Sequence, residues 1–374
     1  MGCAPSSQTR REKLIGTELN IMDAYIRVER EIWQEEQQAP ASALTHAVSK
    51  LEKITSDLER ITADITQSQN YTFNHILNKI YNVDSESLED IDNSIKSVMT
   101  ELRVTNDSRL AAEHEEFIAN LNRKALKCRH VYLLTRRKKE IEEEAAEMSE
   151  KVQNLQKLYE QQNTILHEIF GSAEQSRTES ELDRLRNYRD TLYNGELAWQ
   201  DAIRLTQSAV IFSQVGFNSW QTISVTSNED SRFKLATETR NAIQEAALLI
   251  QLAQSMLPAV QFPYCTHREI SALFQVIKYL YTDMQIPERY EHAKEVYRSF
   301  QKRTAALSKW LKELMDSTIH KDIEEVNAKI STLVTKLNSE RTIQMKKKIP
   351  NASLPNGILA AESLESLNSL HIRK

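Results

Sequence analysis

The chain has 374 residues, a formal net charge of −5 and only six glycines, seven prolines and three cysteines. So few cysteines exclude a disulfide framework, and the slightly acidic balance excludes a generally basic nucleic-acid-binding protein, so we expect no nucleic-acid partner. No proline lies between Pro40 and Pro258, and no glycine between Gly16 and Gly171. Because glycine and proline supply the turns of sheets and long loops, we predict an all-α fold, an elongated multi-helix bundle with coiled-coil-like segments.

The N-terminus carries a lipidation pattern. Its first residues are Met1-Gly2-Cys3-Ala4-Pro5-Ser6. Removal of Met1 leaves Gly2 as an N-terminal glycine with a serine four residues on, which fits the pattern for N-myristoylation. Cys3 is a thiol that a membrane-bound acyltransferase can palmitoylate. This short stretch resembles the N-termini of G-protein α subunits and Src-type kinases, and the resemblance implies a mode of lipidation.

A stable anchor needs more than the myristoyl chain, because one such chain binds membranes only weakly and reversibly. Cys3 is one candidate for the second signal. A short basic group is the other: Arg10, Arg11 and Lys13. We therefore predict that residues 1–11 form a flexible lipidated leader, followed by a helical bundle over residues 12–345.

The first part of the bundle shows a regular apolar stripe. A predicted helix over residues 12–37 ends before Pro40, and from Val48 the apolar residues alternate spacings of three and four, as in a coiled-coil seam. They are Leu51, Ile54, Leu58, Ile61 and Ile65. This pattern fits one helix of an intramolecular bundle as well as a dimeric coiled coil, so a homodimer is left open.

A long helix is predicted between Thr105 and Phe170, and it contains a basic block without an acidic residue. The basic block consists of Arg123, Lys124, Lys127, Arg129, Arg136, Arg137, Lys138 and Lys139. Acidic residues follow it directly, from Glu140 to Glu147. One interpretation is a solvated helix whose charges pair within the helix and with neighbouring helices. The other is a contact with anionic lipids of the cytoplasmic leaflet.

The second half of the chain has fewer long patterns. We predict a sub-boundary near residues 171–177, a capping box that opens a helix at Thr178, and a loop near residues 216–230, where apolar and polar residues interleave. A deeply buried helix from about Asp230 ends at Pro258, and Pro287 opens a last long helix that runs to about Arg341. Residues 346–374 are predicted to be a basic and then disordered tail.

The sequence contains no motif that indicates catalysis. A glycine-rich phosphate loop, metal-ligand spacing and a nucleophile elbow are all missing, so we expect no enzyme, no catalytic residues, no cofactor and no metal. The longest apolar run, residues 246–250, falls far short of the length needed to span a bilayer. The tail begins with Lys346, Lys347 and Lys348, which form a second possible membrane or partner contact.

We therefore expect an acylated peripheral membrane protein at the cytoplasmic face of the plasma membrane. Its helical body would act as a scaffold or adaptor for protein partners that the sequence does not identify. Two alternatives are left open. One is a dimeric membrane-shaping module that resembles BAR-type bundles, and the other is a soluble coiled-coil structural protein with no lipid anchor.

Overall fold

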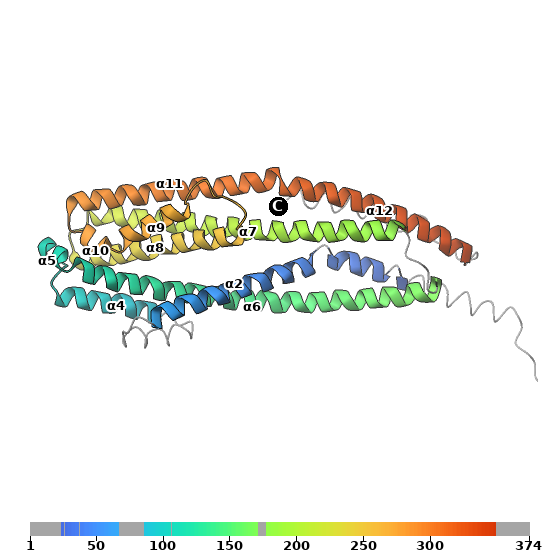
Figure 1. Ribbon diagram of the computed structural model, residues 1–374, viewed down its shortest axis with the longest axis horizontal. Helices are drawn as coiled ribbons and strands as arrows, with labels where there is room; N and C mark the ends of the chain where they lie inside the picture. Colours follow the sequence, from blue (N-terminus) through green and yellow to red (C-terminus); the bar gives the residue numbers. More distant parts are fainter. Residues whose placement is uncertain are drawn as a thin grey trace, which may run out of the picture. The chain divides into compact units, whose positions relative to one another are not determined.

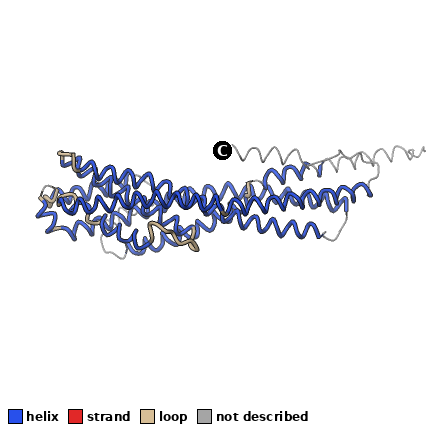
Figure 2. The backbone as a smooth tube through the Cα atoms, turned by 90° about the horizontal axis from the view of Figure 1, so that it is seen from above, coloured by secondary structure: helices blue, strands red, loops and turns tan. Residues whose placement is uncertain are grey.

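A computed structural model describes residues 24–25, 27–36, 38–66, 86–105, 107–170 and 177–348. Within these ranges the chain forms helices and the turns that join them, with no strand (Figure 2), which confirms the predicted all-α fold. The helices, coloured along the chain in Figure 1, are α2 (Pro40–Thr66), α4 (Glu86–Glu101), α5 (Ser108–Glu113), α6 (Glu115–Phe170), α7 (Arg177–Ile223), α8 (Glu229–Met256), α9 (His267–Ile277), α10 (Leu280–Asp283), α11 (Pro287–Ser317) and α12 (Ile319–Lys348). Residues 27–36 are helical as well. The leader over residues 1–11 and the tail after residue 348 lie outside the described residues.

The chain divides into two compact units. Unit 1 takes Met1–Thr45, Ala145–Asn194 and Ile319–Lys374, and unit 2 takes His46–Glu144 and Gly195–Thr318. Helices α2, α6 and α7 each contribute one part to each unit. A further passage lies at the break between α11 and α12, at Thr318. The sub-boundary predicted near residues 171–177 stays a prediction.

Helix α8 supplies the centre of the core of unit 2. Its apolar residues are buried on several sides of the helix, as the sequence predicted: Phe233, Ala236, Ala242, Ile243, Ala246, Ala247, Leu248, Ile250 and Ala253. The alanines let neighbouring helices approach closely, and the larger side chains fill the remaining space. Four polar residues of the same helix are also buried: Thr239, Arg240, Gln244 and Glu245.

An aromatic cluster fastens α7 to α11 in unit 2. Trp220 is fully buried and stacks on Tyr290, with ring centroids 5.1 Å apart, and it meets the edge of Tyr297 at 5.4 Å. The indole N–H of Trp220 donates to the backbone oxygen of Tyr290, and the hydroxyl of Tyr290 donates to the backbone oxygen of Trp220. Such paired hydrogen bonds satisfy the polar ends of both aromatic side chains inside the core.

The loop predicted over residues 216–230 is wrong for most of that range, because α7 continues to Ile223 and α8 begins at Glu229. The buried positions of this stretch recur at helical spacing, at Ser213, Gly216, Trp220 and Ile223. Gly216 faces α8, where an added Cβ would lie 2.6 Å from a side-chain carbon of Ile243. The interleaved apolar and polar residues that suggested a loop therefore belong to a helix, and Gly216 is one of its packing positions.

Two further predictions of helix ends differ from the structure. Thr178 does not cap α7 but lies inside it, and its buried hydroxyl donates to Glu340 at 3.1 Å. The last long helix is divided into α11 and α12 at Thr318. The hydroxyl of Thr318 donates to the backbone oxygen of Leu314 at 2.6 Å. A side-chain hydrogen bond is thus made to a backbone oxygen of the last turn of α11 at this break.

Unit 1 has a smaller apolar core. One cluster joins α7 to α12 through Leu182, Val326, Ile330 and Leu337, with Leu185, Leu192, Leu333 and Val334 packed against it. The helix over residues 27–36 buries Val28 and Ile32, and Tyr25 directly before it is buried too. The spacing of three and four between these positions places them on one face of the helix.

Candidate functional site

The predicted lipidation residues lie outside the described part of the chain. Ala24 is the first residue that the structure describes, so the acylation of Gly2 and Cys3 stays a prediction. The same holds for the basic group of the leader, Arg10, Arg11 and Lys13.

The basic block lies on α6, where its side chains are spread around the helix. A residue advances the helical direction by about 100°, so Arg123 and Lys127 lie on one side and Arg129 and Arg136 on nearly the opposite side. Arg129 is largely buried, with 20% of its side chain exposed, next to Glu245 of α8 at 3.6 Å. The block therefore does not present a single basic face.

Most side chains of the basic block have protein partners. Arg137 pairs with Glu140 at 2.9 Å and Lys138 with Glu142 at 3.9 Å, both within α6. Arg136 also reaches Glu140, Lys127 pairs with Asp64 of α2 at 3.5 Å, and Arg123 donates to Asn120. These contacts agree with the interpretation of charge pairing inside the fold. A lipid contact of the basic block stays a prediction.

A buried ion pair joins α2 to α7 in unit 2. Lys50 donates to Asp201 at 2.8 Å, both side chains are almost fully buried, and His46 lies 2.9 Å from the same carboxylate oxygen. Burial tends to raise the pKa of Asp201, but the hydrogen bonds from His46 and Lys50 outweigh it and hold this pKa well below its ordinary value. Sequence reasoning missed this pair. The sequence signal for it is Lys50, which lies three residues after Ala47 and four residues before Ile54, on the same buried face of the helix.

A second buried polar cluster surrounds Arg240 of α8. Its guanidinium donates to Asn122 at 3.1 Å, to the hydroxyl of Tyr281 at 3.3 Å and to Asp92. Asn122 in turn donates to the backbone oxygen of Lys278 at 3.1 Å, so the cluster links α4, α6, α8 and the turn before α10. A cavity of about 10 Å³ beside Asp92 and Arg240 has room for a single water molecule. The available sequence signal was an arginine within the predicted deeply buried helix.

A third cluster lies at the short helix α10. Asp283 is 8% exposed and accepts a hydrogen bond from Arg289 at 2.7 Å, while Arg289 also pairs with Glu115. Burial raises the pKa of Asp283 to about 6, although Arg289 opposes the shift. The hydroxyl of Tyr297 is buried nearby and has no hydrogen-bond partner among the described residues.

A polar cluster in unit 1 connects the N-terminal helix to three others. Arg341 of α12 donates to the hydroxyl of Tyr25 at 2.7 Å, to Glu29 at 3.3 Å and to Glu179 of α7 at 2.9 Å. Gln162 of α6 donates to the same oxygen of Glu29 at 2.7 Å. Two carboxylates thus share one arginine, and the four helices meet at this point.

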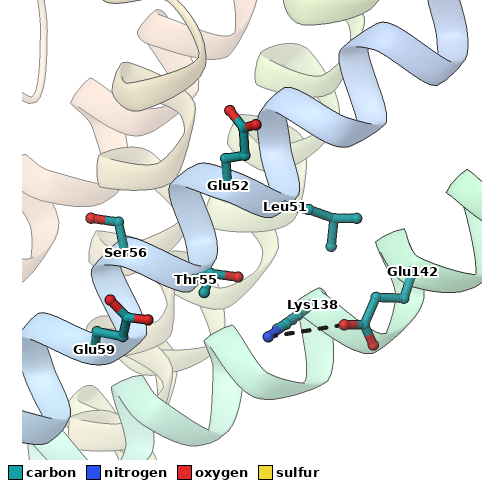
Figure 3. A pocket seen from close by; sticks show the side chains of 7 residues that line it. All are labelled: Leu51, Glu52, Thr55, Ser56, Glu59, Lys138 and Glu142. Atoms are coloured by element: carbon teal, nitrogen blue, oxygen red, sulfur yellow. Dashed lines mark ion pairs between the residues drawn. The ribbon is translucent and has the colours of Figure 1, made fainter.

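An open groove of about 470 Å³ runs between α2 and α6 in unit 2 (Figure 3). Its lining consists of Leu51, Glu52, Thr55, Ser56 and Glu59 from α2 and Lys138 and Glu142 from α6. The dashed line in Figure 3 marks the ion pair between Lys138 and Glu142. Lys138 is the only cation among the lining residues. The remaining carboxylates belong to exposed helix faces, and they show no arrangement that assigns a ligand.

No helix in the described ranges combines the length and the apolar content needed to cross a membrane. Among the same residues, no three His, Cys, Asp or Glu side chains are grouped so that they could hold a metal ion. The cysteines at 128 and 265 are free and buried, as expected for core thiols. Comparison of the chain with protein-family models, with curated proteins and with solved structures finds no match.

Proposed function

We propose that this chain is a peripheral membrane protein, myristoylated at Gly2 and palmitoylated at Cys3, whose helical body holds protein partners at the cytoplasmic face of the plasma membrane. The observation that carries the proposal is the N-terminal sequence Met1-Gly2-Cys3-Ala4-Pro5-Ser6. Two adjacent acylation sites supply the two signals that stable anchoring needs. Each basic residue of the leader near an anionic leaflet adds about 1 kcal/mol of binding.

The helical body supports the scaffold part of this proposal. Ile211 and Val215 lie one turn apart on α7 in unit 2, with 64% and 38% of their side chains exposed. Exposed apolar residues at this spacing suit a helical segment of a partner protein. The buried clusters around Lys50 and Arg240 fix the helices that carry such a surface, because breaking either would leave an unpaired buried charge.

Metabolic labelling and membrane fractionation of the full chain in cells test the proposal. Wild type is expected to incorporate both myristate and palmitate analogues and to sediment with membranes. Gly2→Ala should lose both labels and become soluble, because palmitoylation takes place at a membrane that the myristoyl chain first reaches. Cys3→Ser should keep myristate, lose palmitate and bind membranes only in part. Gly16→Ala and Cys128→Ala are the matched controls, and both should behave as wild type.

If Gly2→Ala leaves labelling and membrane binding unchanged, the proposal is overturned, and the soluble coiled-coil alternative takes its place. Sedimentation of the unacylated chain examines the membrane-shaping alternative. An obligate dimer that deforms vesicles without any acyl chain would favour that alternative over an acylated scaffold.

A further inference from the structure

A stripe of exposed and partly exposed residues runs along the second half of α7 in unit 2, opposite the buried face that contains Gly216 and Trp220. Its positions alternate spacings of three and four residues, the repeat that keeps one face of a helix turned toward a partner helix. Val225, in the turn directly after α7, is the most exposed of its apolar residues at 82%. We name the stripe the α7 seam, and it consists of Ser208, Ile211, Val215, Asn218, Thr222 and Val225.

The α7 seam carries no charge. The sequence contains no Asp, Glu, Lys, Arg or His between Arg204 and Glu229, although charged residues make up 27% of the chain. The solvent face of a helix normally carries charged residues, whereas charged residues are depleted at the centre of protein interfaces. The α7 seam therefore has the composition of an interface, yet it is exposed in this structure.

Polar side chains of the α7 seam already have hydrogen-bond partners within the fold. The hydroxyl of Thr222 donates to the backbone oxygen of Asn218 at 2.9 Å. The side-chain oxygen of Asn218 accepts from Gln214 at 2.7 Å, and Gln214 accepts from Gln301 of α11 at 2.8 Å. Because these bonds do not depend on water, covering the seam costs less than burying polar groups that have no partner.

Charges of opposite sign bound the α7 seam at its two ends. Arg204 precedes it and stays mostly exposed beside Asp201 of its own helix. Glu229 and Asp230 follow it at the start of α8, and Asp230 stays mostly exposed beside Lys96. An antiparallel pair of identical seams brings the basic end of each copy toward the acidic end of the other, whereas a parallel pair brings like charges together. Charge complementarity therefore favours the antiparallel pair.

The spacing of the α7 seam is symmetric about the point between Val215 and Asn218. Each residue before this point has a counterpart at the same distance after it, so a two-fold axis there matches the seam with itself. Self-matching of one surface is what a symmetric dimer interface requires. The facing pairs are Val215 with Asn218, Ile211 with Thr222, and Ser208 with Val225.

We propose that a second copy of this chain docks on the α7 seam, with the two helices antiparallel about a two-fold axis between Val215 and Asn218. The inference names the partner of the exposed apolar residues of α7, so it rests on the scaffold part of the proposed function. The paired length from Arg204 to Ile223 is about 29 Å, which is shorter than the three to four heptads of a convincing coiled coil. The dimer is therefore reversible, and confinement of the acylated chain to a membrane favours it by raising the effective concentration.

Sedimentation equilibrium of the purified, unacylated full chain tests the dimer. Wild type is expected to shift from monomer to dimer as its concentration rises. Val215→Glu should weaken the dimer by about 100-fold, because a glutamate from each copy then lies close to the two-fold axis. Val48→Glu is the matched control. Val48 lies on α2, outside the seam, and its exposed fraction of 44% is close to the 38% of Val215, so this variant should dimerise as wild type does.

Cysteine cross-linking tests the register of the two helices, in a chain that carries Cys3→Ser. An equal mixture of Ile211→Cys and Thr222→Cys chains should form a disulfide-linked dimer, because these positions face each other across the axis. Ile211→Cys alone should not form one. In the antiparallel pair its two copies lie about 16 Å apart along the helix axis, well beyond the Cα separation of about 7 Å that a disulfide spans.

A chain that stays monomeric at every concentration would overturn the inference, and the α7 seam would then be open to a helix of another protein. Equal weakening by Val215→Glu and Val48→Glu would overturn it as well, because the interface would not be specific to α7. A disulfide formed by Ile211→Cys alone would exclude the antiparallel register. No acyl chain takes part in these measurements, so the acylation of Gly2 and Cys3 stands or fails separately in the labelling experiment.

Discussion

Replacing Asp283 by asparagine should stabilise the α10 region at neutral pH, although the change weakens an ion pair. Burial raises the pKa of Asp283 from 3.8 to about 6, despite the neighbouring Arg289. The folded protein therefore binds this proton more tightly than the unfolded chain does. The resulting stability is fully present below the unfolded pKa of 3.8 and is lost as the pH rises through 6.

The size of the effect follows from the shift. A displacement of about two pKa units corresponds to about 3 kcal/mol of stability lost at high pH. Asp283→Asn carries no charge at any pH and should avoid this loss, with a gain of about 1 to 3 kcal/mol near pH 8 and almost none near pH 4. Hydrogen exchange of the amides at residues 280–286, corrected for the intrinsic exchange rate, gives the free energy of local opening.

Asp201→Asn is the matched control, because Asp201 is equally buried but its pKa is shifted down. Removing its charge takes away the buried partner of Lys50 and leaves only the half-exposed Glu144 at 3.3 Å, and the loss of a buried partner costs up to about 3–5 kcal/mol near neutral pH. This advantage of the wild type should fade as the pH falls below 3.8, the ordinary pKa of the carboxyl. If Asp283→Asn also destabilises the protein near pH 8, the pair with Arg289 outweighs burial and the reasoning is wrong.

Three further predictions concern packing and burial. Arg240→Met should lower the free energy of unfolding by about 3–5 kcal/mol in urea titrations, because the partners of the guanidinium lose their counter-charge. An unchanged urea midpoint would contradict a stabilising role of the polar cluster around Arg240. Gly216→Ala should destabilise by about 1–3 kcal/mol through overpacking, whereas Gly195→Ala, with nothing within 4 Å of the new Cβ, should stabilise by up to about 1 kcal/mol; equal effects would refute the close approach at Gly216. Burial raises the pKa of Cys128 to about 12 and of Cys265 to about 11, so both thiols should resist alkylation at pH 8 until the chain is unfolded, and fast labelling of the folded protein would refute their burial.

The sequence was sufficient to predict the fold class. Glycine and proline supply the turns of sheets and long loops, and their scarcity along most of the chain favours helices in each local segment. It also indicated the buried face of α2, where Ile54, Ile61 and Ile65 are buried as their spacing predicts. It misled at residues 216–223, where interleaved apolar and polar residues suggested a loop. The small size of Gly216 serves the approach of α8, and a local pattern contains no information about a neighbour that comes from elsewhere in the chain.

The pairing of buried charges was decided by the tertiary structure alone. Lys50 meets Asp201 across 151 positions, and Arg341 meets Tyr25 across 316. Helical periodicity tells which face of a helix is buried, but it does not tell which helix covers that face. The N-terminal acylation pattern, in contrast, is read by an enzyme from consecutive residues, so the sequence by itself suffices to predict the anchor. That Tyr25 and Arg341 of α12 come together in unit 1 follows only from the packing of its helices.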